Sequence, residues 1–264
     1  MLSYQHIYHA GNMADVHKHA LLAWVLDYMG KKDKPMSYME THSGRGLYQL
    51  DAAEALKTGE AAAGIAVAEK RGWFGADHPY VRVIAAVRDE HGKMAYPGSP
   101  LIAAQCLRET DVMRLAELHP REFEALDEVM GWRATCINRN GIEVALSQTP
   151  PDPKRGVLLI DPSYEVKDEY QTVADLVRQV HRKWNVGVIM LWYPILTDGR
   201  HKQMVRALRA AVPDGIAHEV EFPPAREGHG MVGSGMFVVN APFGFNDEAV
   251  RLTRLFASLP SKKA

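Results

Sequence analysis

The feature that most constrains the fold is a regular alternation of strand-like and helix-like segments. Short apolar runs predict strands at residues 36–40, 112–117, 133–138, 157–161, 186–192, 217–222 and 235–240. Segments with helical periodicity predict helices at residues 120–131, 169–183, 201–211 and 247–259. Strands that alternate with helices are typical of an α/β protein with a doubly wound, mainly parallel sheet.

Two segments before residue 112 differ from this pattern. Residues 12–29 are predicted to form a helix, with Asn12 as its N-cap and Asp15 in its first turn. Residues 51–95 are rich in alanine and predict two or three helices without a strand, and YPGSP after them predicts a turn. We therefore expect a main domain of residues 1–50 and 96–264 with a helical insertion at 51–95.

The composition is that of an ordinary globular protein. Of the 264 residues, 47% are apolar and 24% are charged, and the net charge is −1, so an RNA site would have to come from local basic patches. The longest apolar run, residues 186–196, is too short to span a bilayer, and the N-terminus lacks the pattern of a signal peptide. Cys106 and Cys136 fit no metal motif and indicate a reducing compartment. We expect a cytoplasmic protein.

The segment VLLIDPSYE carries the strongest chemical signal. Its apolar run ends in Asp161, followed by Pro162 and Tyr164, and ligands of open α/β sheets bind beyond the carboxyl ends of strands. A carboxylate and a nearby carbonyl are two acceptors that match an NH2 group, and an aromatic ring can stack on a base. Amino-group methyltransferases use this arrangement. Asp-Pro alone is also common in ordinary turns.

Three weaker signals follow other predicted strands. METHSGRG offers small residues where a ligand could approach the backbone, but it has no third glycine of the dinucleotide fingerprint. Glu117 ends a strand, where an acidic side chain commonly binds ribose hydroxyls. Asn140 and Gly141 could read a cofactor's adenine ring, or they could form a plain turn.

Histidines gather near the N-terminus, together with Tyr4 and Lys18, at positions 6, 9, 17 and 19. His17 and His19 would point to different faces of the predicted helix and cannot chelate one metal together. A basic arm with aromatic residues that contacts RNA is the alternative that we favour over a metal site, and a solvated terminus stays open.

In combination these segments resemble the bacterial large-subunit ribosomal RNA methyltransferase J family, adenine-N6 methyltransferases that act on 23S rRNA. The resemblance runs nearly end to end and is carried by MLSYQHIYHAGNMADVHKH, YMETHSGRGLYQL, YPGSPLIA, LAELHP, LLIDPSYE, LWYP and SGMFVVN. It implies a class I S-adenosylmethionine-dependent methyltransferase fold, Rossmann-like, with a small helical insertion.

The resemblance also implies site residues. Asp161, Pro162 and Tyr164 would form the catalytic motif, and Tyr4 would touch the RNA. The expected cofactor-binding residues are Lys18, His19, His42, Ser99, Glu117, Asn140, Gly141 and Asp161. The sequence departs from the family pattern at Ser163, which replaces a second proline, and at Asn140, which replaces an aspartate.

The reaction expected from this resemblance needs S-adenosylmethionine and 23S rRNA, and no metal, membrane or second subunit. The target adenine would leave its stack and lie against Tyr164, while Asp161 and the Pro162 carbonyl accept its N6 hydrogens. The alternatives are a nicotinamide- or nucleotide-binding oxidoreductase on the same sheet, a hydrolase built on the twelve histidines, and an RNA-binding module without activity.

Overall fold

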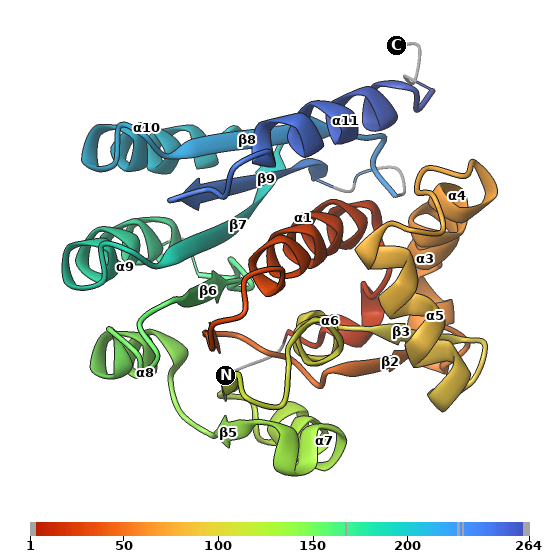
Figure 1. Ribbon diagram of the computed structural model, residues 1–264. Helices are drawn as coiled ribbons and strands as arrows, with labels where there is room; N and C mark the ends of the chain where they lie inside the picture. The colour runs from red at the N-terminus through yellow and green to blue at the C-terminus, as the bar shows by residue number, and fades with distance from the viewer. Residues whose placement is uncertain (1–3, 167, 226–227, 229, 261–264) are drawn as a thin grey trace.

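The protein is an α/β sandwich built on one twisted sheet (Figure 1). The computed structural model describes residues 4–166, 168–225, 228 and 230–260. Among them, seven strands form the large sheet in the order β5-β4-β1-β6-β7-β9-β8. The strands are β1 (Ser37–Glu40), β4 (Val112–Ala116), β5 (Thr135–Ile137), β6 (Gly156–Ile160), β7 (Val188–Leu196), β8 (Ile216–Glu221) and β9 (Met231–Val239). Neighbouring strands are parallel, except that β9 is antiparallel to both β7 and β8. The predicted α/β fold with a doubly wound, mainly parallel sheet is confirmed.

Two apolar cores lie on the two faces of this sheet, because successive side chains of a strand point in opposite directions. In β6, Val157 and Leu159 belong to one core, whereas Leu158 and Ile160 belong to the other. The helices of the second core are α8 (Gly141–Gln148), α9 (Glu169–Lys183) and α10 (His201–Ala211). The first core is covered by α1 (Met13–Gly30), α6 (Ser99–Cys106), α7 (Pro120–Met130) and α11 (Phe245–Ala257). Short 3-10 turns are η1 (His6–Tyr8) and η2 (Gly131–Arg133).

Helix α1 is the most enclosed helix of the first core. It packs against α6, α11, β9 and the insertion, and Figure 1 shows it between the sheet and the insertion helices. Asn12 caps it, since its side chain accepts a hydrogen bond from the Asp15 amide. The buried residues of α1 include His17, Lys18 and His19, so this part of the N-terminal cluster forms no arm. Each of these polar side chains therefore needs a partner inside the protein.

The insertion contains more helices than predicted and is closed by a strand pair that the sequence did not reveal. Residues 51–95, all of them described, hold α2 (Ala53–Thr58), α3 (Glu60–Ala63), α4 (Ile65–Lys70) and α5 (Pro79–His91). At its base β2 (Leu47–Gln49) pairs antiparallel with β3 (Ala95–Pro97). The prediction of a turn at 96–100 is therefore wrong, because β3 runs into α6 there. That 51–95 forms a separate subdomain stays a prediction.

Two other differences from prediction lie beside the site. Residues 141–148 form α8 rather than a plain turn. Strand β7 extends past Trp192 through Pro194 to Leu196. A proline is tolerated there because β6 pairs with β7 only as far as Leu191, so the missing amide lies on an open strand edge. None of the described helices is both long enough and apolar enough to cross a membrane.

Candidate active site

The predicted site residues come together in one pocket of about 390 Å³ beyond the carboxyl ends of the strands. Its lining includes Tyr4, Lys18, His19, His42, Ser99, Glu117, Asn140, Gly141, Asp161, Pro162 and Tyr164. They come from the N-terminal turn, from α1 and α6, and from the segments after β1, β4, β5 and β6. The sequence therefore located a single site, although the role of each residue stays a prediction.

The segment after β6 forms the floor of the pocket. Asp161 follows the last strand residue, and Pro162 and Ser163 come next. Tyr164 has a φ of 56°, which is uncommon for a non-glycine residue and costs conformational energy. Its hydroxyl donates to the Trp192 carbonyl at 2.7 Å, and its ring packs on Tyr170 with centroids 4.4 Å apart. The strained turn is thus held from two sides.

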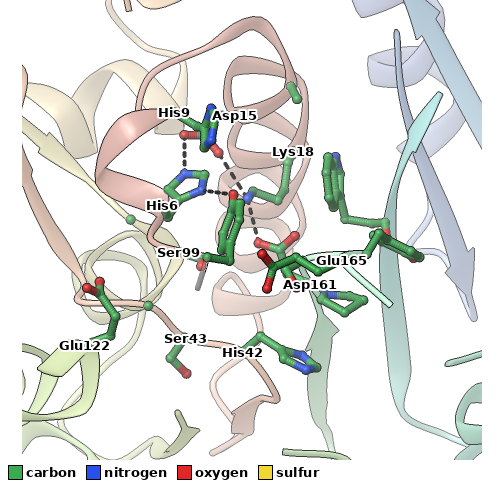
Figure 2. A pocket seen from close by; sticks show the side chains of 18 of the residues that line it. His6, His9, Asp15, Lys18, His42, Ser43, Ser99, Glu122, Asp161 and Glu165 are labelled. Carbon is green, nitrogen blue, oxygen red and sulfur yellow. Dashed lines mark hydrogen bonds and ion pairs between the residues drawn. The ribbon is translucent and has the colours of Figure 1, made fainter. Parts of the chain in front are cut away.

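A buried ion-pair network lies over Asp161 (Figure 2). Lys18 Nζ donates to Asp161 Oδ2 at 2.6 Å and lies 3.0 Å from Asp15 Oδ1. Burial disfavours the ammonium, but Asp161 and Asp15 outweigh it and raise the pKa of Lys18. Burial also opposes the Asp15 carboxylate, and His6 and Lys18 nevertheless hold its pKa well below the ordinary value. Lys18 is therefore a fixed cation between two carboxylates.

The N-terminal turn closes one side of the pocket through the same network. The His6 ring joins Tyr4 and Asp15, because Nδ1 is 2.8 Å from the Tyr4 hydroxyl and Nε2 is 2.8 Å from Asp15 Oδ2. The Tyr4 ring stacks on His9 with centroids 5.7 Å apart. His9 Nδ1 lies 3.0 Å from Glu60 of the insertion. Within the described ranges, no group of three or more histidine, cysteine or acidic residues could hold a metal ion.

The loop after β1 turns sharply at its glycines and is hydrogen bonded to Glu117, the residue that follows β4. Gly44 has a φ of 60°, and a Cβ there would lie 2.5 Å from the Tyr48 hydroxyl. Glu117 accepts the Gly44 amide at 2.8 Å and the His119 amide at 2.7 Å. Burial raises the pKa of Glu117, and the two amides oppose that shift. The carboxylate is thus held at the pocket edge, where we expect ribose hydroxyls.

Asn140 and Gly141, at the start of α8, both have structural roles. A Cβ at Gly141 would lie 1.8 Å from the Thr41 carbonyl oxygen, so only glycine allows this close approach. Asn140 Oδ1 caps the helix by accepting the amides of Ile142 and Glu143. The same oxygen was predicted to accept from a cofactor's amino group, and in this structure it is engaged by the cap.

Two polar atoms at the same end of the pocket suit a bound ligand. Among the described residues, Ser43 Oγ and His119 Nδ1 are buried without a hydrogen-bond partner. Buried polar groups are normally satisfied, so a polar ligand such as an adenosyl group fits here. His42, next to Ser43 in the sequence, lines the same pocket, and burial lowers its pKa to about 4. We therefore expect His42, as a neutral imidazole, and His119 to contact an adenosyl group through hydrogen bonds.

Two residues of this region were missed by sequence reasoning. Glu40, at the end of β1, is hydrogen bonded to Ser99 and to the Tyr38 hydroxyl, and burial raises its pKa to about 8. Trp192, on the open edge of β7, lines the pocket beside Pro162. A polar residue at the end of an apolar strand could have signalled Glu40, whereas Trp192 looks like a core residue in sequence.

Comparison with known proteins now decides between the alternatives. A family model described as "Ribosomal RNA large subunit methyltransferase D, RlmJ" matches residues 33–260. The chain belongs to this family. The proteins named "Ribosomal RNA large subunit methyltransferase J" of Escherichia coli strain K12 and of Haemophilus influenzae are 37% and 36% identical to it, over 251 and 252 residues respectively. In both cases the match covers 92% of this chain and 88% of the relative.

A solved structure shares the fold over nearly the whole chain. The crystal structure of a protein from Legionella pneumophila matches with a TM-score of 0.85 and 31% identity. The match covers 95% of this chain and 93% of that one. The resemblance inferred from the motifs is confirmed, and membership in a methyltransferase family speaks against the oxidoreductase, the histidine-based hydrolase and the inactive RNA-binding module.

Proposed function

We propose that the protein transfers a methyl group from S-adenosylmethionine to the N6 amino group of an adenine in 23S ribosomal RNA. The observation that carries this proposal is the position of Asp161 and Pro162 at the end of β6, inside the pocket and under Lys18. The RNA substrate implies action in the cytoplasm. We expect a monomer. We also expect that the reaction needs no metal, because the proposed site contains its own cation in Lys18.

The amino group would be held by two acceptors. Lys18 occupies Asp161 Oδ2, so we assign Oδ1 and the Pro162 carbonyl to the two N6 hydrogens. These hydrogen bonds draw the nitrogen lone pair out of conjugation with the ring and aim it away from the acceptors. S-adenosylmethionine, when bound, supplies the electrophilic methyl group. Fixing the amino group in line with it could contribute several of the ~7–11 kcal/mol available from orientation.

Proton loss needs no strong base in this arrangement. The N6 proton becomes acidic only as the new N–C bond forms, and Asp161 is already in position to receive it. The Lys18 ion pair holds the carboxylate in place during this step. Lys18 also lies over the Trp192 ring, 5.4 Å from its centroid, so the cation keeps its position when the pocket fills.

The remaining pocket residues would bind S-adenosylmethionine and the RNA in different parts of the pocket. We assign Glu117, Ser43, His119 and His42 to the adenosyl group, since they provide a carboxylate and unpaired polar atoms at one end. Ser99, His19, Asn140 and Gly141 line the same cavity, and we assign them to the cofactor as well. Tyr4 is assigned to the RNA at the opposite end.

The decisive test is methyl transfer from tritiated S-adenosylmethionine to unmodified 23S rRNA, 16S rRNA and DNA. Nuclease digestion of the product identifies the modified nucleoside. We expect N6-methyladenosine in 23S rRNA alone. Labelling of another base, or of no nucleic acid at all, would refute the proposed substrate. Titration with S-adenosylmethionine and with NAD then tests the cofactor separately, and binding of NAD alone would refute the methyltransferase chemistry of this chain.

A further inference from the structure

A continuous chain of hydrogen bonds runs from the pocket wall through the core to the last helix. Trp192 Nε1 donates to Ser234 Oγ at 2.9 Å, and Ser234 Oγ lies 2.8 Å from His17 Nδ1. His17 Nε2 lies 2.9 Å from His218 Nδ1. His218 Nε2 lies 2.9 Å from the Thr253 hydroxyl. The links come from β7, β9, α1, β8 and α11, so five elements meet in this one chain.

The two ends of the chain fix the direction of every hydrogen in it. An indole nitrogen can only donate, so Ser234 accepts from Trp192 and gives its own proton to His17 Nδ1. Thr253 donates to the Ala249 carbonyl at 3.1 Å, so it accepts from His218 Nε2. His218 Nδ1 must then accept from His17 Nε2. Each hydrogen has one acceptor when both imidazoles are neutral and carry the proton on Nε2.

The environment of the imidazoles agrees with this assignment. His17 is fully buried, and His218 is 8% exposed. Burial, reinforced by the neighbouring His218, lowers the pKa of His17 well below its ordinary value. Burial also lowers the pKa of His218. A polar network that is fully satisfied in this way makes a core rigid and holds its members at fixed angles.

The pocket end of the chain is the indole ring of Trp192. Trp192 lies beyond the last β6–β7 pair, where among the described strands only β9 supports β7. Lys18 lies over its ring, and Tyr164 meets the ring at an interplanar angle of 61°. Both neighbours belong to the proposed reaction site, so a rotation of the indole would disturb Lys18 and the floor of the pocket together.

We propose that this chain is a positioning device for Trp192, and that the fixed indole is the pocket wall against which the target base lies beside Asp161. Trp192 thereby replaces Tyr164 as the expected stacking partner, because the Tyr164 ring is buried against Tyr170. The inference rests on the proposed function for the identity of the base. Ser234, His17 and His218 act as positioning residues through Trp192 and touch no substrate themselves. The orientation of a ring at the reaction centre is thereby set by residues on the far side of α1.

The kinetic test compares two fully buried serines. Ser234→Ala breaks the chain next to Trp192, whereas Ser37→Ala removes a hydroxyl that donates to the Pro153 carbonyl at the other end of the sheet. With saturating RNA, Ser234→Ala should lower kcat about 10-fold and leave the Kd for S-adenosylmethionine unchanged, since misplacement near the reacting atoms slows chemistry. Ser37→Ala should keep the kcat of the wild type.

A double-mutant cycle separates positioning from general loss of structure. In a Trp192→Phe background there is no indole proton to orient, so Ser234→Ala should lower kcat less than about twofold further. Additive losses would overturn the proposal, and so would a normal kcat in Ser234→Ala alone. The thermal midpoints of all variants are measured in parallel.

Nuclear magnetic resonance tests the chain without reference to any activity. The ¹⁵N shifts of His17 and His218 should report the neutral Nε2–H form for both rings, and Ser234→Ala should shift the Trp192 indole resonance. A proton on Nδ1 of either ring, or an indole signal that does not move, would overturn the inference. If the wild type methylates no RNA, the proposed function fails, and these spectra still decide whether the chain exists. Thr253→Val, at the exposed far end, provides a second variant that should perturb the His218 shifts.

Discussion

Two hydrogen-bond networks leave helix α1 from adjacent residues, and they differ in charge. Lys18 joins Asp15 and Asp161 in a network of ions at the reaction site. His17 joins Ser234 and His218 in a network of neutral groups that crosses the core. Both are buried, and both reach the pocket, one at Asp161 and the other at Trp192. The charged network is short, while the neutral one extends across the protein to the last helix.

The difference shows where this protein places buried charge. A buried ion carries a large desolvation penalty and is tolerated when several partners surround it. Around Lys18 these partners lie within one helical turn and one strand end. Neutral imidazoles and hydroxyls carry a smaller penalty, so they can be spread over many elements. Of these two networks, the charged one lies where the amino group would react, and the uncharged one transmits orientation.

The largest expected effect comes from removing the acceptor of the charged network. Asp161→Ala should lower kcat by at least about 10²-fold, because loss of one preorganised hydrogen-bonding group in an active site commonly has an effect of this size. Binding of S-adenosylmethionine should largely persist. Single-turnover methyl transfer and titration calorimetry measure the two effects. Asp175→Ala, in an exposed pair with Arg178, is the control, and near-normal turnover of Asp161→Ala would refute the role of Asp161.

The second effect should appear in stability as well as in activity. Lys18→Met leaves Asp15 and Asp161 buried without their shared cation, which should lower the free energy of unfolding by about 3–5 kcal/mol. Urea denaturation measures this loss. Lys31→Met, in an exposed pair with Asp27 on the same helix, should change it by less than about 1 kcal/mol. Equal losses in the two variants would contradict the distinction between buried and exposed ions.

A third experiment uses pH to separate the networks. The pKa of His17 is lowered in the folded state, so below about pH 6.5 the unfolded chain binds a proton that the folded chain does not, and stability falls. The pKa of Asp15 is also lowered, and its contribution is lost only below about pH 3.9. Between these values the contribution of His17 should change with pH, and that of Asp15 should not.

The variant for this experiment is His17→Gln. The free energy of unfolding from urea titrations between pH 4.5 and 7 should fall less steeply with acid than in the wild type, by up to about 1.4 kcal/mol per pH unit. His91→Gln, at the end of α5 and outside both networks, is the control. A slope for His17→Gln that equals the wild-type slope would show that His17 binds a proton as readily in the folded protein as in the unfolded chain.

The smallest expected effect lies at the outer end of the neutral network. Thr253→Val removes the hydroxyl that His218 Nε2 contacts, and the nearby Ala249 carbonyl remains as an acceptor. The free energy of unfolding should fall by about 0.5–1.5 kcal/mol, the usual net value of one hydrogen bond. Thermal denaturation is sensitive enough to detect this. A loss of unfolding free energy as large as that of Lys18→Met would mean that a group in the neutral network is charged.

Sequence reasoning succeeded where a pattern is local. The helices at 169–183 and 201–211 have the predicted bounds, because amphipathic periodicity decides them. The motif around Asp161 located the pocket, since the end of an apolar strand can be recognised without knowledge of its neighbours. The short β2–β3 pair was missed because each strand has three residues, and their pairing depends on the ends of the insertion meeting.

Contacts between distant residues were beyond such reasoning. His17 and His218 are 201 positions apart, and nothing in either segment announces the other. The buried Lys18 was expected near the cofactor, but its pairing with Asp161 follows from the packing of α1 on the sheet. At Asn140 a local pattern was misleading. The Asn-Gly pair suggested a plain turn, whereas Asn140 caps α8.

The enclosure of α1 also has a consequence for synthesis on the ribosome. This helix emerges well before two of its partners, β9 and α11, which follow it by about two hundred residues. Until then a largely apolar helix with an uncompensated lysine and two uncompensated histidines has no finished core to enter. Domains fold as units during synthesis, and exposed apolar segments attract chaperones in the meantime. The nascent protein should therefore depend on such protection until α11 leaves the exit tunnel.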